Sequence, residues 1–233
     1  GSVAIDGDTI VIGATGASTG GAVYVFRTSD GGATYDQVVK LTAADAAEDD
    51  QFGKSVAIDG GTVVVGAYNK NGGTGAVYVF RTTDGGATYD QVAKLTAADA
   101  SNDDGFGVSV AIDGGTVVVG AYQDDDAGSD SGSVYIFRTS DGGATYGQVV
   151  KLTASDAAAW DRFGVSVAID GDTIVVGAFQ LLTGPGKAYI FQTDDGGATY
   201  DQVAKLTADD GANQDNFGGS VAIAGNTVVV GAK

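Results

Sequence analysis

The sequence contains no cysteine, histidine or methionine, and it has one proline and one tryptophan in 233 residues. Without cysteine and histidine the chain has no disulfide, no thiol nucleophile and no histidine base, and it lacks the usual zinc ligands. No apolar run approaches the roughly 20 residues that a membrane-spanning helix needs. We therefore expect neither a zinc site, nor histidine-based catalysis, nor insertion into a membrane.

Positive charge is also scarce. The 12 Lys and Arg residues face 30 Asp and Glu residues, which gives a formal net charge of −18. Such a surface repels phosphate backbones, so nucleic acid is not expected as a partner, whereas cations and basic surfaces fit better. The chain is nevertheless 43% hydrophobic, which is enough to form a core and too apolar for a disordered tail.

The chain is a tandem repeat. The segment Phe-Gly-x-Ser-Val-Ala-Ile-Asp-Gly, with small variations, recurs with its serine at residues 55, 109, 166 and 220, and Ser2 begins a copy that lacks Phe-Gly. Each full unit holds four short runs rich in Val, Ile and Tyr, which in the second unit are residues 55–59, 62–67, 76–81 and 91–97. Turn residues such as Asp-Gly separate these runs, so the pattern predicts antiparallel strands joined by tight turns.

Four strands at this repeat length are typical of the blades of a β-propeller. The run Thr-Val-Val-Val-Gly-Ala is apolar at successive positions, as expected for a strand covered on both faces. We predict an all-β propeller of about five blades of four antiparallel strands, with the last blade incomplete at two strands. The predicted single domain spans residues 1–233, with units at about 1–51, 52–105, 106–162 and 163–216 and a half unit at 217–233.

The repeated motifs resemble those of a known family. Phe-Gly at residues 52–53, Ser-Val-Ala-Ile at 55–58, Val-Gly-Ala at 65–67 and Gly-Ala-Val-Tyr-Val-Phe at 75–80 are similar to the FG-GAP repeat of integrin α-subunit propellers. The hairpins with Asp30, Asp84, Asp141 and Asp195 resemble the Asp-box (BNR) turn of sialidase-type propellers, with Tyr in place of the more usual Trp. The resemblance implies a propeller that serves as a binding or adhesion module at an extracellular or cell-surface location, although no export signal opens this chain.

Two family properties do not carry over to these residues. Integrin propellers bind Ca²⁺ in the loop between the first and second strands of a blade, but turns such as Asp59-Gly60-Gly61 offer too few oxygens for the six to eight ligands of Ca²⁺. Sialidase chemistry needs converging arginines, and three of the four arginines here occupy the same place in different units. We therefore predict no enzyme activity, and a glycoside hydrolase is the disfavoured alternative.

Aspartate is the residue whose positions invite a functional explanation. Most of the 29 Asp residues fall in recurring turn slots, where a carboxylate accepts hydrogen bonds from nearby backbone N–H groups. We expect that no cofactor is required. The alternative is that pairs of carboxylates share a cation, for which Ca²⁺ is the candidate. Its ligands would be the paired carboxylates that precede each Phe-Gly: Asp45 and Asp50, Asp99 and Asp104, Asp156 and Asp161, and Asp210 and Asp215.

The loop after the second strand is where the units differ, and variable loops on a rigid scaffold are common recognition sites. In the third unit this loop is rich in aspartate, in the fourth it carries Leu-Leu, and the single Trp lies nearby. Trp and Arg are enriched in binding hot spots. The candidate partner-binding residues are Tyr122, Asp124, Asp125, Asp126, Asp130, Trp160, Arg162, Leu181 and Leu182.

The sequence thus favours a non-catalytic module that binds protein or glycan through loops on one face of the propeller. The alternative is a structural, self-assembling propeller, a homo-oligomer in which another chain completes the incomplete blade.

Overall fold

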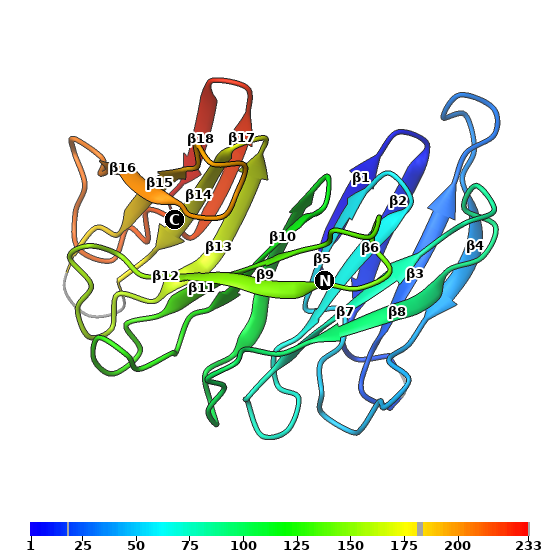
Figure 1. The fold of residues 1–233 in the computed structure, drawn as a ribbon, viewed down its shortest axis with the longest axis horizontal. Coiled ribbons are helices and arrows are strands. Elements are labelled where there is room, and N and C mark those ends of the chain that lie inside the picture. Colours follow the sequence, from blue (N-terminus) through cyan, green and yellow to red (C-terminus); the bar gives the residue numbers. More distant parts are fainter. Residues whose placement is uncertain (18, 181–183, 233) are drawn as a thin grey trace.

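The computed structural model describes residues 1–17, 19–180 and 184–232. In this part of the chain every regular element is a β-strand, arranged in four four-stranded antiparallel sheets and one two-stranded sheet, and no helix is present that could cross a membrane. Figure 1 shows the sheets standing side by side in sequence order. The fold is an all-β propeller architecture with an incomplete last blade, as predicted.

We call the four-stranded sheets blades 1 to 4 and the last sheet the half-blade. Blade 1 contains β1 (Val3–Asp6), β2 (Thr9–Ala14), β3 (Ala22–Arg27) and β4 (Asp36–Leu41). Blade 2 contains β5 (Ser55–Asp59), β6 (Thr62–Ala67), β7 (Ala76–Arg81) and β8 (Asp90–Leu95). Blade 3 contains β9 (Phe106–Asp113), β10 (Thr116–Ala121), β11 (Ser133–Arg138) and β12 (Gly147–Leu152). Blade 4 contains β13 (Phe163–Asp170), β14 (Thr173–Ala178), β15 (Lys187–Gln192) and β16 (Asp201–Leu206). The half-blade contains β17 (Ser220–Ala224) and β18 (Thr227–Gly231).

The first two strands of each sheet form a tight hairpin. In blade 2, Asp59 pairs with Thr62 across a turn of two glycines, and Gly60 has a φ of +54°. A two-residue turn between right-twisted strands requires this left-handed backbone, which glycine adopts without a steric penalty. The Asp-Gly signal in the sequence therefore sets the register of this hairpin in blades 1 to 4, and Ala224-Gly225 takes its place in the half-blade.

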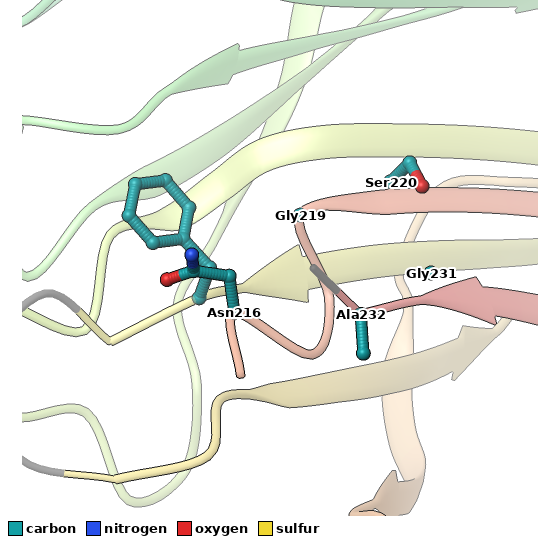
Figure 2. A pocket seen from close by; sticks show the side chains of 6 residues that line it. Asn216, Gly219, Ser220, Gly231 and Ala232 are labelled. Atoms are coloured by element: carbon teal, nitrogen blue, oxygen red, sulfur yellow. The ribbon is translucent and has the colours of Figure 1, made fainter. Parts of the chain in front are cut away.

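The half-blade has a pocket at the end of its two strands. Ser220 pairs with Gly231, and the pocket of about 330 Å³ beside them is also lined by Asn216, Gly219 and Ala232. Figure 2 shows Ser220 and Gly231 on neighbouring strands next to this opening. The pocket lies at the position where, in the other sheets, the next Phe-Gly segment packs.

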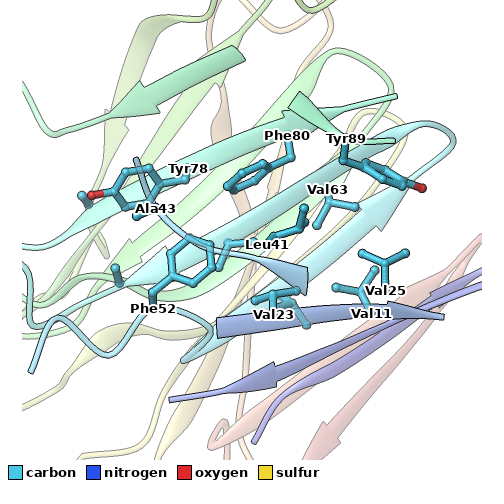
Figure 3. Close-up of a cluster of buried hydrophobic side chains, with 14 residues drawn as sticks. Val11, Val23, Val25, Leu41, Ala43, Phe52, Val63, Tyr78, Phe80 and Tyr89 are labelled. Atoms are coloured by element: carbon cyan, nitrogen blue, oxygen red, sulfur yellow. The ribbon is translucent and has the colours of Figure 1, made fainter. Parts of the chain in front are cut away.

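The hydrophobic core lies between consecutive blades. Between blades 1 and 2, valines of β2 and β3 such as Val11 and Val23 pack against Phe52 and Tyr78, as Figure 3 shows. The rings of Phe52 and Tyr78 meet edge to face with centroids 5.6 Å apart. Equivalent pairs, Phe106 with Tyr135 and Phe163 with Tyr189, recur in the next two junctions at 5.5 Å. The Phe of Phe-Gly is thus a packing residue of the core in these three junctions.

The same strand sequence is buried to a different extent in different sheets. In β6 the central valines Val63, Val64 and Val65 are fully buried, whereas in β18 Val229 is 61% exposed. The two strands share Thr-Val-Val-Val-Gly, so the difference comes from their neighbours. Blades 2 and 3 are covered on both faces, and the half-blade is covered on one.

Adjacent sheets also approach at their backbones. The hydroxyl of Ser55 donates to the carbonyl oxygen of Gly107 in the next unit at 2.8 Å, and Ser2, Ser109 and Ser166 make the equivalent bond to Gly53, Gly164 and Gly218. The facing position in the second strand is glycine because there is no room for a side chain. A Cβ at Gly120 would lie 1.9 Å from the carbonyl oxygen of Gly164.

We predict that Gly120→Ala destabilises the protein by about 3 kcal/mol, because the added methyl meets backbone that cannot move without opening the junction. For a chain of this length the loss corresponds to a melting temperature lower by about 6 to 12 °C. The control is Gly147→Ala on β12, where a Cβ would meet no atom within 4 Å. Equal melting temperatures for the two variants would contradict the close approach.

Candidate functional site

The strand order places two kinds of connection at one end of the sheets, which we call the loop end. The loops between the second and third strands of each blade lie here, and so do the connections from each fourth strand to the next sheet. Antiparallel order brings these connections together, because every second turn of a meander falls on the same side. All the predicted partner-binding and metal-binding residues that the structure describes belong to these connections.

At the junction of blades 1 and 2, the predicted carboxylate pair shares a lysine. The ammonium of Lys70 lies 2.7 Å from Asp50 Oδ2 and 3.7 Å from Asp45 Oδ2. Lys94 on β8 approaches the same Asp45 oxygen to 2.6 Å, and the hydroxyl of Tyr78 donates to Asp45 Oδ1 at 2.6 Å. Two carboxylates therefore face two ammonium groups, and the local charge is balanced.

The junction of blades 3 and 4 repeats this arrangement with a lysine from another position. Lys187 lies 3.1 Å from Asp161 and 3.5 Å from Asp156. Lys205 takes the place of Lys94, 2.7 Å from Asp156. Asp161 is fully buried, and its pairing with Lys187 is what makes that burial tolerable.

The junction of blades 2 and 3 differs in charge. Asp124 stands at the repeat position of Lys70, since both follow Ala-Tyr-x. Lys151 is 2.7 Å from Asp99 and 3.0 Å from Asp124, and it also contacts Asp126. Asp104 completes the group, which we call the acidic cluster: Asp99, Asp104, Asp124 and Asp126 around Lys151.

The acidic cluster thus contains four carboxylates and a single ammonium group, that of Lys151. One oxygen each from Asp99, Asp124 and Asp126 lie within 4.8 Å of one another, which is a spacing that can hold a cation, and in this structure the ammonium of Lys151 bonds to all three. A pocket of about 210 Å³ opens beside them and is also lined by Ser101 and Asp125. This end of blades 2 and 3 is strongly anionic.

The pKa values reflect this difference between junctions. Burial would raise the pKa of Asp45, but hydrogen bonds from Lys94 and Tyr78 and the charge of Lys70 lower it to about 2. Asp156 behaves in the same way and has a pKa of about 2. In contrast, burial and the nearby charge of Asp124 raise the pKa of Asp104, although a backbone hydrogen bond from Ser101 opposes the rise. Burial would lower the pKa of Lys151, but the hydrogen bonds that its ammonium donates to Asp126, Asp99 and Asp124 raise it.

The fourth predicted pair precedes the half-blade. Asp210 is exposed, and Asp215 is half-buried and accepts a hydrogen bond from the backbone N–H of Ala212 at 2.7 Å. The latter bond recurs at Asp50, Asp104 and Asp161. It fixes the turn before each Phe-Gly, which is the structural role expected of a repeated aspartate.

Two of the predicted partner-binding residues, Tyr122 and Asp130, lie against a third, Arg162. Its guanidinium carbon lies 5.4 Å from the ring centroid of Tyr122 and 5.6 Å from that of Phe179, and it pairs with Asp130 at 3.1 Å. Backbone bonds from Trp160 to Ser129 and from Arg162 to Asp130 join the two segments. We call Tyr122, Asp130, Trp160, Arg162 and Phe179 the aromatic patch.

The backbone under the aromatic patch is common to all units. Trp160 has a φ of +70°, and Asp49 and Asp103 at the equivalent positions each have a φ of +66°. The left-handed geometry therefore belongs to the repeated connection, and the Trp160 side chain is what distinguishes the connection between blades 3 and 4. Trp160 is 38% exposed. The predicted residues Leu181 and Leu182 lie outside the described residues.

The opposite end of the sheets is uniform. Asp30 accepts hydrogen bonds from the hydroxyl groups of Thr28 and Thr34 and from the backbone N–H of Thr34, which together hold its pKa well below its usual range. Asp84, Asp141 and Asp195 do the same. The nearby Arg27 and Arg138 each donate to a glycine carbonyl of the adjacent unit's turn. These side chains complete turns and junctions.

Sequence reasoning missed the lysine partners of the carboxylate pairs. The recurring Lys94, Lys151 and Lys205 each bond to an aspartate of the preceding unit. A signal was available, because these lysines and Asp45, Asp99 and Asp156 recur with the same period. Lys70 and Lys187 gave no such signal, since they occupy different positions in their units.

Comparison with known families assigns the chain. The FG-GAP repeat model matches residues 1–26, 35–80, 89–137, 146–191 and 200–233, and the chain therefore belongs to the FG-GAP repeat family. The gaps between the matched segments fall on the Asp-Gly-Gly turns between the third and fourth strands of each blade. No curated protein matches the sequence.

Among solved structures, the chain is similar to the crystal structure of Saccharomyces cerevisiae Sqt1, with a TM-score of 0.42 and 13% sequence identity. The match covers 65% of this chain and 34% of Sqt1, so the chain spans about a third of that protein's length.

We predict that Lys151→Met destabilises the protein much more than Lys94→Met. Removing Lys151 leaves the buried Asp104 and Asp124 without an ammonium, which costs about 3 kcal/mol or more. After Lys94→Met the ammonium of Lys70 remains, and the lost pair is partly exposed, so the loss is about 1 kcal/mol or less. Thermal melts of both variants measure the difference.

The same variants test for a cation. A ligand that binds the folded state raises the melting temperature, so millimolar Ca²⁺ in place of EDTA should raise that of Lys151→Met and leave that of Lys94→Met unchanged. An equal rise in melting temperature with Ca²⁺ in both variants would contradict a cation site that is specific to the acidic cluster.

We also predict that stability falls between pH 4 and pH 2. The folded-state pKa values of Asp45 and Asp156 are about 2, below the ordinary aspartate value of 3.8. Their contribution is therefore present above the unfolded pKa and is lost as the pH falls through the folded one. Urea melts from pH 5 to pH 2 should show a shallower decline for the Asp45→Asn, Asp156→Asn double variant; a decline as steep as that of the wild type would argue against these pairs.

Proposed function

We propose that this FG-GAP propeller is a non-catalytic binding module, which engages a protein or glycan partner through the loop end of blades 3 and 4. The observation that carries the proposal is the aromatic patch, where Arg162, which no other unit has at its position, contacts the rings of Tyr122 and Phe179 on a backbone common to all units. Variable side chains on a repeated scaffold are the usual form of a recognition surface. The FG-GAP fold itself suggests a module of binding or adhesion type.

The chemistry of this end favours a partner with basic groups. The acidic cluster supplies an excess of carboxylates, and Asp125 and Asp126 are exposed beside its pocket. The exposed Trp160 offers an aromatic surface at the next junction, between blades 3 and 4. Arginine and lysine side chains pair with carboxylates and stack on aromatic rings, so a basic peptide surface suits both features.

Two considerations support a non-catalytic role. The FG-GAP family is typically non-catalytic, and Arg27 and Arg138 are engaged by turns of adjacent units rather than directed to a common point. An active site needs different groups converging on one substrate. The acidic surface and the family resemblance favour an extracellular or cell-surface location, which is part of the same proposal.

We predict that Trp160→Ala and a graft of the unit 2 loop over residues 122–131 each weaken binding at least tenfold, because hot-spot aromatics carry a large share of binding energy. The probes are immobilised arginine- and lysine-rich peptides and a glycan array, with binding measured by biolayer interferometry.

The matched control is Tyr35→Ala. Tyr35 is 39% exposed, almost the same as Trp160, but it belongs to the Asp-Gly-Gly turn at the opposite end of blade 1. A probe that binds the wild type, the loop graft and Trp160→Ala alike, or that loses binding through Tyr35→Ala, would contradict the placement of the site.

A further inference from the structure

One lysine and one aspartate at the junction of blades 1 and 2 are buried together and in direct contact. The side chains of Lys70 and Asp50 have 5% and 6% of their surface exposed, and Lys70 Nζ lies 2.7 Å from Asp50 Oδ2. The ammonium also donates to the backbone carbonyl oxygen of Asp45. An ion pair in such a place has lost the hydration of both charges, and this loss opposes its stability.

The backbone holds both side chains in place. The N–H of Lys70 donates to the carbonyl oxygen of Ala67 at 3.1 Å, and the carbonyl oxygen of Lys70 accepts a bond from Gly75 at 2.9 Å. Asp50 closes a turn, since its Oδ2 accepts a bond from the backbone N–H of Ala47 at 2.7 Å. Two groups held in a productive geometry react with an effective concentration of about 10⁵–10⁸ M. The lysine nitrogen is thus presented to the carboxyl group by two fixed segments.

A second carboxylate stands beside the pair, at the edge of solvent. Asp45 Oδ2 lies 3.7 Å from Lys70 Nζ, and the Asp45 side chain is 47% exposed. This carboxylate has partners of its own, because Lys94 lies 2.6 Å from the same oxygen and Tyr78 donates to the other. Asp45 is therefore placed to take a proton from Lys70, and it connects the buried pair to water.

We propose that Lys70 and Asp50 condense to an amide, which is an isopeptide bond between their side chains. The ion pair in the structure is the reactant state. One proton of the ammonium passes to Asp50, and the neutral amine attacks Cγ of Asp50 to form the C–N bond. A second proton leaves the nitrogen through Asp45 and reaches the departing hydroxyl, so one carboxyl oxygen leaves as water. The positive and negative charges cancel, the Asp45 carboxylate is regenerated, and no further reactant is consumed.

Burial favours the amide over the ion pair. Condensation replaces two desolvated charges by one neutral group and releases water past the half-exposed Asp45. The N–H of Ala47 remains available to the amide oxygen, and the amide N–H has the carbonyl oxygen of Asp45 beside it. Asp45 keeps Lys94 and Tyr78 as partners. The inference concerns the scaffold and does not rest on the proposed binding function.

The equivalent places in the next two junctions differ. Lys187 lies 3.1 Å from Asp161, but its side chain is 17% exposed, so water can solvate its ammonium. The other carboxylate oxygen of Asp161 accepts a bond from the amide of Gln180. At the junction of blades 2 and 3, Asp124 stands at the position of Lys70. We therefore expect one amide in each chain, at the junction of blades 1 and 2.

The test is the intact mass of the denatured protein, in which an amide survives and an ion pair does not. The wild type should be lighter than its sequence by about 18 Da, the mass of one water. Lys70→Arg keeps the positive charge but has no amine to condense, so it should have the full mass. The matched control is Lys187→Arg, which should keep the deficit. A wild type of full mass, or a Lys70→Arg variant with the deficit, would overturn the proposal.

Tryptic mapping of the wild type locates the bond and does not depend on the folding of any variant. An amide on Lys70 blocks cleavage after that residue and joins residues 41–54 to residues 55–81. Asp-Gly turns can also lose water, by forming a succinimide, but that product stays within one linear peptide. A deficit found only in a linear peptide would therefore overturn the amide.

Asp45→Asn tests the proton carrier. The amide of asparagine does not take a proton from an amine, so the deficit should form about 100-fold more slowly than in the wild type. The rate is measured by mass spectrometry after cell-free synthesis. Asp156→Asn, the same change at the junction of blades 3 and 4, is the control and should leave the rate unchanged. Equal rates in the wild type and Asp45→Asn would contradict the proposed proton route.

Discussion

Face-to-face packing of one small sheet on the next is the interaction on which the rest of this structure depends. None of the sheets has a hydrophobic core of its own, since a single twisted sheet exposes both faces, so stability comes from the junctions. Two sequence features make the junction close enough to exclude water. The second strand is apolar on both faces, and glycine at its end lets the Phe-Gly backbone of the next unit approach, as Gly120 does toward Gly164. The buried Phe then fills the space between the sheets.

Polar groups give each junction its register. The Ser55 hydroxyl and the Asp59 carboxylate each bond to backbone of unit 3, and their equivalents repeat along the row. Such bonds add modest net stability, but leaving their buried partners unpaired would be costly. The lysine and carboxylate groups of the loop end follow the same logic. Lys70 and Lys187 pair with equivalent aspartates, Asp50 and Asp161, from different positions in their units. Each of these junctions therefore needs a positive charge beside the buried aspartate, and not a lysine at one fixed position of the repeat.

Much of the fold could be predicted because the local and global signals agree. Asp-Gly turns, apolar second strands and the repeat period all point to antiparallel blades, and the incomplete last blade follows from counting strands. The degree of burial could not be predicted, because Val64 and Val229 occupy the same sequence context and differ only in their neighbours. Only part of the candidate site could be recognised in the sequence. The variable loop and Trp160 stood out as departures from the repeat, whereas the contact of Arg162 with both Tyr122 and Phe179 depends on three separate segments meeting in space.

In a repeat protein, function is confined to positions at which the units differ in sequence. Two such differences in this chain have different consequences for the scaffold. Replacement of Asp49 or Asp103 by Trp160 alters an exposed side chain on unchanged backbone, which costs the scaffold little. Replacement of Lys70 by Asp124 reverses a charge in a buried position, and the structure offsets it by drawing Lys151 into contact with three carboxylates. Burying such an excess of negative charge opposes stability. The acidic cluster is therefore the feature of this chain that folding alone explains least, and it lies beside the residues that are best suited to contact a partner.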